Sequence, residues 1–394
     1  MLPVKDQLRR LALGLGFTLG LPWLGYSLWD PGVSSSQGRY DRGRNGLWIA
    51  HGWMADDSWF AINRRDRAGY DSVAARERLQ STCEDNGIGS VFPHLCPATQ
   101  SGDLPAHDPV RAEALLDALP AVKVLPWVGG VHGRHCPVES PVWRARFVLS
   151  CAELLRRHPR LAGLHLNIEP MPDGNAAFLS LLEELKTAMP PDKMISVAAY
   201  PPPTRWHPHP EVHWSEIYYR EVDRRCDQLV PMMYDTSLRL EKVYTRLVAS
   251  WTRDVARWTT RAELLLGLPA YEDEQVAYHD PRVENVGNAL RGANAGLLSL
   301  GPRANRIVGI ALYADWTTTP EEWVVFRSGF RGPSLPAGPD ANTNPPSGVP
   351  ITPPPLRAPS RGSPRPPHAP GRSPASHARD KRRAPRDCPP RISA

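Results

Sequence analysis

The segment from Ala162 to Pro170, AGLHLNIEP, decides the fold of this chain. Three aliphatic residues in it alternate with His165, Asn167 and Glu169. Successive side chains of a β-strand point to opposite faces, so these three polar residues share one face. A polar column inside a fold is costly unless its members are hydrogen-bonded. The alternation therefore predicts a buried strand whose polar face ends in the carboxyl group of Glu169.

Eight short apolar runs, this segment included, recur along the chain. They are rich in Val, Ile and Leu, as expected for a sheet that is buried on both faces. The predicted strands are Gly46–His51, Ile88–Phe92, Val122–Val128, Gly163–Ile168, Met194–Ala199, Gln228–Tyr234, Leu264–Ala270 and Ile307–Tyr313. The predicted helices between them are Ala74–Cys83, Arg111–Leu119, Ala145–Arg157, Ala176–Ala188, Tyr244–Thr259, Val283–Leu298 and Pro320–Arg327.

Alternating strands and helices imply parallel pairing through right-handed crossovers. Eight such units within residues 45–330 match the size of a TIM barrel, so we expect an α/β fold of the (β/α)8 type. An open doubly wound sheet is the competing fold, but it usually carries a Gly-rich phosphate turn, and no G-x-G-x-x-G or Walker motif occurs. The long aromatic segment from Pro201 to Tyr219 predicts a loop or subdomain at the barrel mouth.

The N-terminal residues 1–29 have the pattern of a signal peptide or a membrane anchor. Lys5, Arg9 and Arg10 precede an uncharged stretch over residues 11–29, which is close to the length that spans a bilayer. No clear cleavage site follows, so both a cleaved signal and an uncleaved tether remain open. The basic residues on the inner side predict an exported barrel that is periplasmic, extracellular or membrane-anchored and faces outside. Residues 30–44 are polar and are expected to form a linker.

The C-terminal residues 331–394 are expected to be a disordered, basic, Pro-rich tail. The stretch from Gly332 to the end holds 18 prolines and 10 Lys or Arg against three acids. Its apolar content is too small to offset the entropy of ordering it. The rest of the chain has 37 basic and 38 acidic residues and is nearly neutral. We therefore expect no nucleic-acid partner, since that would require a basic face on the fold, and we expect a monomer.

Six cysteines fit an oxidising compartment. Cys83 and Cys96, and likewise Cys136 and Cys151, are near enough in sequence to join loops, but connectivity stays open, and so does the alternative of scattered reduced thiols. No C-x-x-C motif occurs, and the three histidines His207, His209 and His213 alternate with prolines, which is typical of an exposed loop. No metal and no cofactor are expected.

Active sites of such barrels lie at the carboxyl ends of the strands, and five strand ends here share a family pattern. The strand containing Glu169 resembles the D-x-x-D-x-D-x-E signature of glycoside hydrolase family 18, the chitinase and endo-β-N-acetylglucosaminidase family. Four further strand ends resemble, in order, its S-x-G-G, M-x-Y-D, G-x-P-x-Y and final aromatic positions. These are Trp127 to Gly130, Met232 to Asp235, Gly267 to Tyr271 and Gly309 to Tyr313.

The resemblance implies a retaining glycosidase that acts on a glycan containing N-acetylhexosamine. The substrate's own 2-acetamido oxygen would attack the anomeric carbon, Glu169 would be the general acid/base, and Asn167 would orient the acetamide. Tyr234 would donate a hydrogen bond to the acetamido oxygen, and Asp235 would hold its neighbours or a sugar hydroxyl. The expected substrate-binding residues are Tyr313, Trp127, His165 and Trp316, and Trp53 and Trp206 are further aromatic side chains that could stack on sugar rings.

The signature is degenerate, because Asn167, His165 and Ala162 stand where the family has aspartates. Glycoside hydrolase family 85, which is similar at this point, has Asn-x-Glu and keeps the substrate-assisted route. Neighbouring anions normally help a general acid to stay protonated, and a protonated His165 would act in the opposite sense. The replacements therefore predict an acid-shifted pH optimum or weak activity.

Three alternative functions stay open on the sequence. The first is a lectin-like barrel that binds glycans without hydrolysing them, although retention of Glu169 favours an enzyme. The second is a two-carboxylate retaining glycosidase in which Glu272 or Glu274 is the nucleophile, ~5–5.5 Å from Glu169. The third is an anchored scaffold that uses the Pro-rich tail to reach partners.

Overall fold

The computed structural model of the chain describes residues 18, 20–205, 207, 209–272 and 278–332. Trp206, Glu274, most of the predicted export segment and the predicted tail from residue 333 onward lie outside the described residues.

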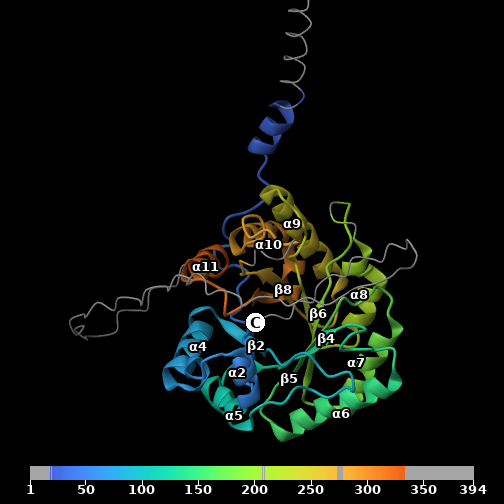
Figure 1. Cartoon of the computed structure of the whole chain (residues 1–394). Coiled ribbons are helices and arrows are strands. Elements are labelled where there is room, and N and C mark those ends of the chain that lie inside the picture. The colour runs from blue at the N-terminus through green and yellow to red at the C-terminus, as the bar shows by residue number, and fades with distance from the viewer. Residues whose placement is uncertain (1–17, 19, 206, 208, 273–277, 333–394) are drawn as a thin grey trace, which may run out of the picture. The chain divides into compact units, whose positions relative to one another are not determined.

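The described chain is a parallel β-barrel surrounded by helices (Figure 1), which confirms the predicted (β/α)8 fold. All strand pairs are parallel, in the order β3-β2-β1-β9-β8-β7-β6-β5-β4. The strands are β1 (Asn45–Ile49), β2 (Ile88–Pro93), β3 (Lys123–Val124), β4 (Trp127–Val131), β5 (Gly163–Glu169), β6 (Met194–Ala199), β7 (Gln228–Pro231), β8 (Glu263–Pro269) and β9 (Ile307–Tyr313).

The third strand of the barrel is interrupted, which the sequence did not predict. Pro126 has no N–H to donate, and it separates β3, which pairs with β2, from β4, which pairs with β5. The barrel still closes here, because the N–H of Leu125 bonds the carbonyl of Val91 at 3.0 Å and the N–H of Ala162 bonds the carbonyl of Val124 at 2.9 Å. Together β3 and β4 therefore serve as one strand of an eight-stranded barrel.

The helices follow the strands and cover the outside of the barrel. Most begin at a residue whose side chain accepts a hydrogen bond from the first turn; Ser140 before α6 and Asn175 before α7 are examples. The helices are α2 (Asp57–Asn63), α3 (Ala68–Asp71), α4 (Val73–Asp85), α5 (Pro109–Ala118), α6 (Pro141–Arg157), α7 (Ala176–Ala188), α8 (Glu216–Asp223), α9 (Glu241–Trp258), α10 (Val286–Leu300) and α11 (Pro320–Phe326).

The caps explain where the sequence-based boundaries were wrong. Helix α6 begins at Pro141 rather than at Ala145, because Ser140 caps it and proline is accommodated in the first turn. The segment predicted as a loop from Pro201 to Tyr219 already contains the start of α8, capped by Ser215. It also contains Trp214, which is fully buried and donates a hydrogen bond to the carbonyl of Met171 at 3.0 Å. Part of this segment is thus integral to the barrel wall.

The predicted linker over residues 30–44 packs against the barrel. Ser36 is buried, its N–H bonds the carbonyl of Gly329, and its hydroxyl bonds the carbonyl of Phe330 at 2.9 Å. Asp41 forms an ion pair with Arg331 at 2.8 Å. Hydrogen bonds and an ion pair therefore join the segment before β1 to the segment after α11.

Residues 20–28, in the predicted export segment, are helical. Several of its apolar side chains are exposed, among them Trp23 at 70% and Leu28 at 77%. Within the part of the chain that the structure describes, no helix has the length and apolar character needed to cross a membrane.

The five cysteines among the described residues are free and buried, so the disulfides considered from sequence spacing do not form among them. Burial raises the pKa of each of these thiols, which makes them inert at neutral pH. The cysteines of the barrel thus act as small core residues, and they give the oxidising compartment no support.

A glycine on β4 makes a testable contribution to the barrel. Gly129 has φ +128, and a Cβ at this position would lie 2.0 Å from the carbonyl oxygen of Asn167 on β5. We predict that Gly129→Ala lowers the free energy of unfolding by about 2–5 kcal/mol, from backbone strain and a forced separation of the strands. Urea unfolding measures this change. Gly69→Ala, where a Cβ meets nothing within 4 Å, is the matched control, and equal stability of the two variants would contradict the strain.

Candidate functional site

The carboxyl end of β5 presents Glu169 at the barrel mouth. Glu169 is partly exposed, whereas Asn167, two residues earlier on the same face, is 6% exposed. The amide nitrogen of Asn167 donates to Oε1 of Glu169 at 2.6 Å, and the hydroxyl of Tyr200 donates to Oε2 at 3.4 Å. The amide oxygen of Asn167 is buried and has no hydrogen-bond partner among the described residues. The polar column predicted on β5 is therefore present, and it leaves one acceptor available.

His165 lies one layer deeper and has no exposed surface. The indole N–H of Trp48 donates to its Nε2 at 3.1 Å, so its proton is on Nδ1, which lies 2.8 Å from the hydroxyl of Ser196. That hydroxyl in turn donates to Gln228 at 2.8 Å. Burial lowers the pKa of His165 to about 3. His165 is therefore a neutral residue of the barrel interior that supports the site from below, and it places no positive charge beneath Glu169.

The aromatic residues predicted at the mouth meet around Tyr313. Its ring stacks on that of Tyr234, with centroids 5.7 Å apart and an interplanar angle of 24°. Trp127 and Trp316 contact the same ring edge-on at 6.1 and 5.6 Å. Tyr313 and Trp316 are partly exposed, whereas Trp127 is 6% and Tyr234 is 6% exposed. These four residues come from the start of β4, the segment after β7 and the end of β9, and they form one aromatic cluster with Tyr313 and Trp316 as its most accessible members.

Asp235 faces the other side of this cluster. It accepts a hydrogen bond from the hydroxyl of Tyr271 and lies 3.3 Å from Nδ1 of His279. Tyr271 contacts both Tyr234 and Tyr313 edge-on. Asp235 has a positive φ of 60°. The residue therefore links the aromatic cluster to the segment that precedes α10.

Three residues of the mouth were missed in the sequence, although each lies at or just beyond a strand end. Tyr200 follows β6, Asp315 lies two residues after β9, and His94 follows β2. Asp315 accepts from the indole N–H of Trp53 at 3.4 Å, and burial raises its pKa to about 7. Its Oδ1 is buried and has no hydrogen-bond partner in the described part of the chain. The signal that could have found all three is their position, since the carboxyl ends of strands form the mouth of such a barrel.

The remaining sequence expectations are less central. Trp53 is 8% exposed and packs on Tyr70, so little of its ring is available to a sugar. Glu272 is exposed. His207 and His213 are buried and bonded to each other at 2.6 Å rather than forming part of an exposed loop, and only His209 of this group is exposed. The reason is that His207 and His213 pack against Trp251.

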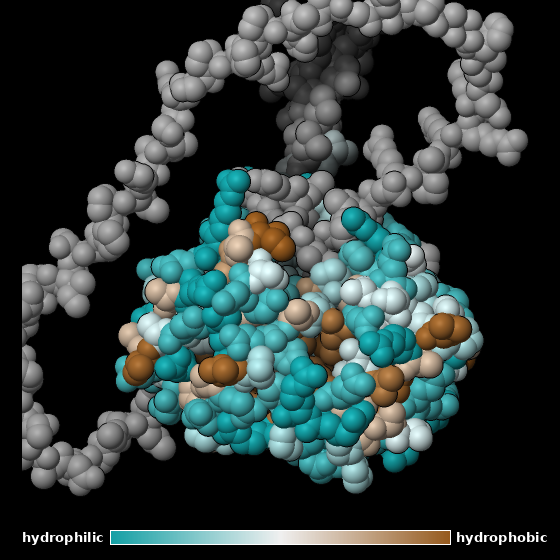
Figure 2. All heavy atoms as spheres, turned by 60° about the horizontal axis from the view of Figure 1, so that its bottom comes forward, coloured by the Kyte–Doolittle hydropathy of each residue, from teal (hydrophilic) through white to brown (hydrophobic). Residues whose placement is uncertain are grey.

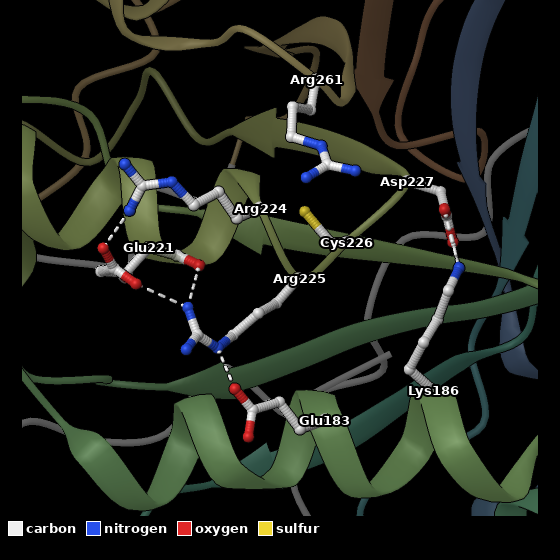
Figure 3. Close-up of a pocket in the computed structure, with 8 residues that line it drawn as sticks. All are labelled: Glu183, Lys186, Glu221, Arg224, Arg225, Cys226, Asp227 and Arg261. Atoms are coloured by element: carbon white, nitrogen blue, oxygen red, sulfur yellow. Dashed lines mark hydrogen bonds and ion pairs between the residues drawn. The ribbon is translucent and has the colours of Figure 1, made fainter.

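A pocket at the opposite end of the barrel offers no comparable chemistry (Figure 3). Its residues come from α7, α8 and the segments just before β7 and β8, that is, from the amino ends of strands. The charges in it are largely paired, as in the ion pairs of Arg225 with Glu183 and of Lys186 with Asp227. This end of a TIM barrel generally serves stability.

The face shown in Figure 2 is mostly hydrophilic with scattered apolar residues, and it displays no extended docking patch.

Comparisons with known proteins bear on the fold. Neither a protein-family model nor a curated protein matches the sequence. Among solved structures, a chitinase from Chromobacterium violaceum ATCC 12472 is similar with a TM-score of 0.50 and 14% identity, over 73% of this chain and 98% of that chain. The Bacillus cereus spore cortex-lytic enzyme SleL has a TM-score of 0.49 and 10% identity, over 73% and 74% of the two chains. A fungal endo-β-N-acetylglucosaminidase from glycosyl hydrolase family 18 has 0.45 and 14%, over 73% and 98%.

The class of protein that these observations define is a (β/α)8 barrel whose mouth carries the carboxyl group of Glu169 and an aromatic cluster around Tyr313. More particularly, the fold is similar to that of the chitinase from Chromobacterium violaceum, in agreement with the chitinase-like strand ends of the sequence. At these identities the likeness extends to the fold, and the chemistry has to be derived from the residues of the mouth.

The buried histidines predict a specific loss of stability in acid. Burial lowers the pKa of His165 and His94 to about 3 and that of His51 to about 4, from 6.5. Below pH 6.5 the unfolded chain binds protons that the folded protein does not, so stability is complete above this pH and falls toward pH 3–4. We expect each histidine to remove about 1.4 kcal/mol per pH unit in this window.

Urea unfolding at several values between pH 7 and pH 5 measures this loss. His51→Gln should reduce the dependence on pH by about one proton, whereas His209→Gln, at an exposed residue, should leave it unchanged. Stability that is flat from pH 7 to pH 5 would show that these imidazoles are not held neutral.

Proposed function

We propose that this protein is a retaining glycoside hydrolase that acts on a glycan containing N-acetylhexosamine, with Glu169 as the general acid/base. The observation that carries the proposal is the pairing of Glu169 with Asn167 at 2.6 Å on the carboxyl end of β5. This pairing lies at the end of the barrel where catalytic groups of TIM barrels are found. The fold shared with a chitinase from Chromobacterium violaceum supports the choice of substrate class.

In the proposed reaction the substrate supplies its own nucleophile. The oxygen of its 2-acetamido group attacks the anomeric carbon while Glu169 donates a proton to the departing glycosidic oxygen. A cyclic oxazolinium ion results, and Glu169, now a carboxylate, takes a proton from the water that opens it. Configuration at the anomeric carbon is retained because two displacements occur.

Asn167 suits both halves of this cycle. Its buried amide oxygen, which has no hydrogen-bond partner within the described residues, can accept the N–H of the acetamide and turn the acetamide oxygen toward the anomeric carbon. Its NH2 group donates to Glu169 when that residue is a carboxylate. Unlike an aspartate, Asn167 carries no charge to stabilise the oxazolinium ion. The proposal therefore includes slow turnover.

The aromatic cluster forms the floor on which the sugar lies. Tyr313 and Trp316 are partly exposed and can stack on the apolar C–H face of a pyranose ring. The hydroxyl of Tyr234 would donate to the acetamido oxygen. Trp127 and His165 support this floor from within the barrel, and Tyr200 adds a hydrogen bond to the carboxyl group of Glu169.

Binding without hydrolysis is the second function that an observation favours. Asn167 carries no charge that could stabilise an oxazolinium ion, and its NH2 group already occupies Oε1 of Glu169. A barrel held in this state would bind an oligosaccharide and leave it intact. No observation favours the two-carboxylate route through Glu272 in the same way.

The proposed hydrolysis predicts that the full-length chain distinguishes two kinds of substrate. It should release the fluorophore from a chitobioside and leave a matching glycoside without the 2-acetamido group untouched, because the second substrate lacks the nucleophile. Glu169→Gln should lower kcat by about 10²–10⁴-fold, the contribution of a general acid/base.

Glu84→Gln, on the exposed surface of α4, is the control and should retain full activity. Equal turnover of both substrates would rule out substrate assistance. Hydrolysis that survives Glu169→Gln would remove this residue from its role. Oligosaccharide binding without turnover by the wild type would establish the lectin-like function instead.

We further propose that the barrel is exported and tethered through residues 11–29. The support is the uncharged stretch after Lys5, Arg9 and Arg10, together with the exposed apolar side chains of residues 20–28. Residues 1–44 fused to a reporter enzyme that is active only outside the cytoplasm should yield activity in the membrane fraction. Activity in the soluble external fraction would indicate a cleaved signal, and an inactive fusion would contradict export.

A further inference from the structure

Three ionisable side chains from distant parts of the sequence converge beside the mouth. Asp235 lies beyond the end of β7, and His279 and Glu284 lie before α10. One donor atom from each of the three lies within 4.8 Å of those of the other two. Nδ1 of His279 is 3.3 Å from Oδ1 of Asp235 and 3.7 Å from Oε2 of Glu284. The side chains of His279 and Glu284 have no exposed surface, so this is an enclosed cluster rather than a solvated acidic patch.

The hydrogen bond of His279 to a backbone carbonyl determines which ring nitrogen carries the proton and which one faces the carboxylates. Its Nε2 lies 3.1 Å from the carbonyl oxygen of Tyr271. A carbonyl can only accept, so Nε2 carries the proton and donates it. In the neutral ring, Nδ1 is then a lone pair. This buried nitrogen makes no hydrogen bond with any described residue, although it points between two carboxylate groups.

Each of the three side chains is held in place by a hydrogen bond from outside the cluster. The hydroxyl of Tyr271 donates to Asp235, and the Tyr271 carbonyl holds His279. The backbone N–H and the hydroxyl of Thr236 both donate to Oε1 of Glu284, at 3.0 and 2.9 Å. Outer partners of this kind fix metal ligands in proteins and orient their lone pairs toward one point. The other oxygen of Glu284, Oε2, is the one that faces His279.

The charges around the cluster leave room for a cation. Among the described residues, the only ion-pair partner of Glu284 is His279. The neighbouring arginines Arg239 and Arg282 both form ion pairs with Asp280. Two carboxylates and a lone pair that face one another repel unless positive charge lies between them.

We propose that Asp235, His279 and Glu284 form a binding site for a divalent transition metal ion of the Zn²⁺ type. Ligand atoms at ~2.0–2.2 Å from Zn²⁺ in a tetrahedral arrangement are about 3.3–3.5 Å apart. The 3.3 Å between His279 and Asp235 fits this spacing, and the 3.7 Å between His279 and Glu284 is slightly wider. One imidazole with two carboxylates selects Zn²⁺ over Ca²⁺ or Mg²⁺, which prefer oxygen ligands throughout.

The proposed ion would join the end of β7 to the segment before α10. Through Tyr271, which bonds Asp235 and contacts Tyr313, it would also hold one side of the aromatic cluster. Binding of the ion does not depend on the proposed hydrolysis, since it can be measured without any glycan.

The test uses the full-length chain after treatment with a chelator. We expect it to take up one Zn²⁺ per chain, measured by titration calorimetry and elemental analysis, and to melt at a higher temperature with Zn²⁺ but not with Ca²⁺. His279→Gln and Glu284→Gln should each weaken uptake at least about 100-fold. His213→Gln is the matched control, because it also alters a buried histidine that bonds a backbone carbonyl. This variant should bind Zn²⁺ like the wild type.

Co²⁺ binding can be measured on the wild-type protein by absorption. The proposal can therefore be tested even if a variant fails to fold. Co²⁺ in the proposed site should give the intense visible absorption of tetrahedral nitrogen and oxygen ligation, and Zn²⁺ should abolish it. No uptake of either ion by the wild type would overturn the proposal and identify the cluster as an imidazolium between two carboxylates. Uptake that is lost in His213→Gln but kept in His279→Gln would overturn it as well, by placing the metal at the pair of His207 and His213.

Discussion

The interior of a closed parallel barrel excludes water, so every polar group on β5 has to find its partner within the protein. The chain of hydrogen bonds from Trp48 through His165 and Ser196 to Gln228 meets this requirement. It ties together β1, β5, β6 and β7, four of the strands of the barrel. The polar groups of this layer are hydrogen-bonded and carry no charge. Asn167 and Glu169, which form the next polar layer at the mouth, therefore have no unpaired charge beneath them.

The mouth itself depends on a second contact, the ring of Tyr313 at the end of β9. It contacts Tyr234 after β7, Trp127 at the start of β4 and Trp316 just beyond β9 itself, and the four rings form one aromatic cluster. Glu169 is held separately, by Asn167 and Tyr200. The proposed glycosidase chemistry follows from these two features of the mouth, a carboxyl group held by polar partners and an aromatic cluster with two partly exposed rings.

The replacements in the strand motif have a common physical effect, which is to remove charge. Where family 18 enzymes have aspartates, this chain has an amide and an imidazole that burial keeps neutral. Asp315, a second carboxyl group at the mouth, follows β9, and burial raises its pKa to about 7. Negative charge is instead concentrated beside the mouth, at Asp235 and Glu284 around His279. Electrostatics of the mouth therefore differ from those that the motif implies.

The sequence by itself determined the barrel and the place of Glu169, because alternation along a strand and the order of strands and helices are local properties of the chain. It also identified Asn167, Tyr234 and Tyr313, since they occupy strand ends. It could not find the hydrogen bond of Tyr200 to Glu169 or the cluster of Asp235, His279 and Glu284, because these depend on where side chains meet across the barrel. Only the tertiary structure decided which side chains are buried. Because packing excludes water from them, His165 is neutral and the five described cysteines are inert.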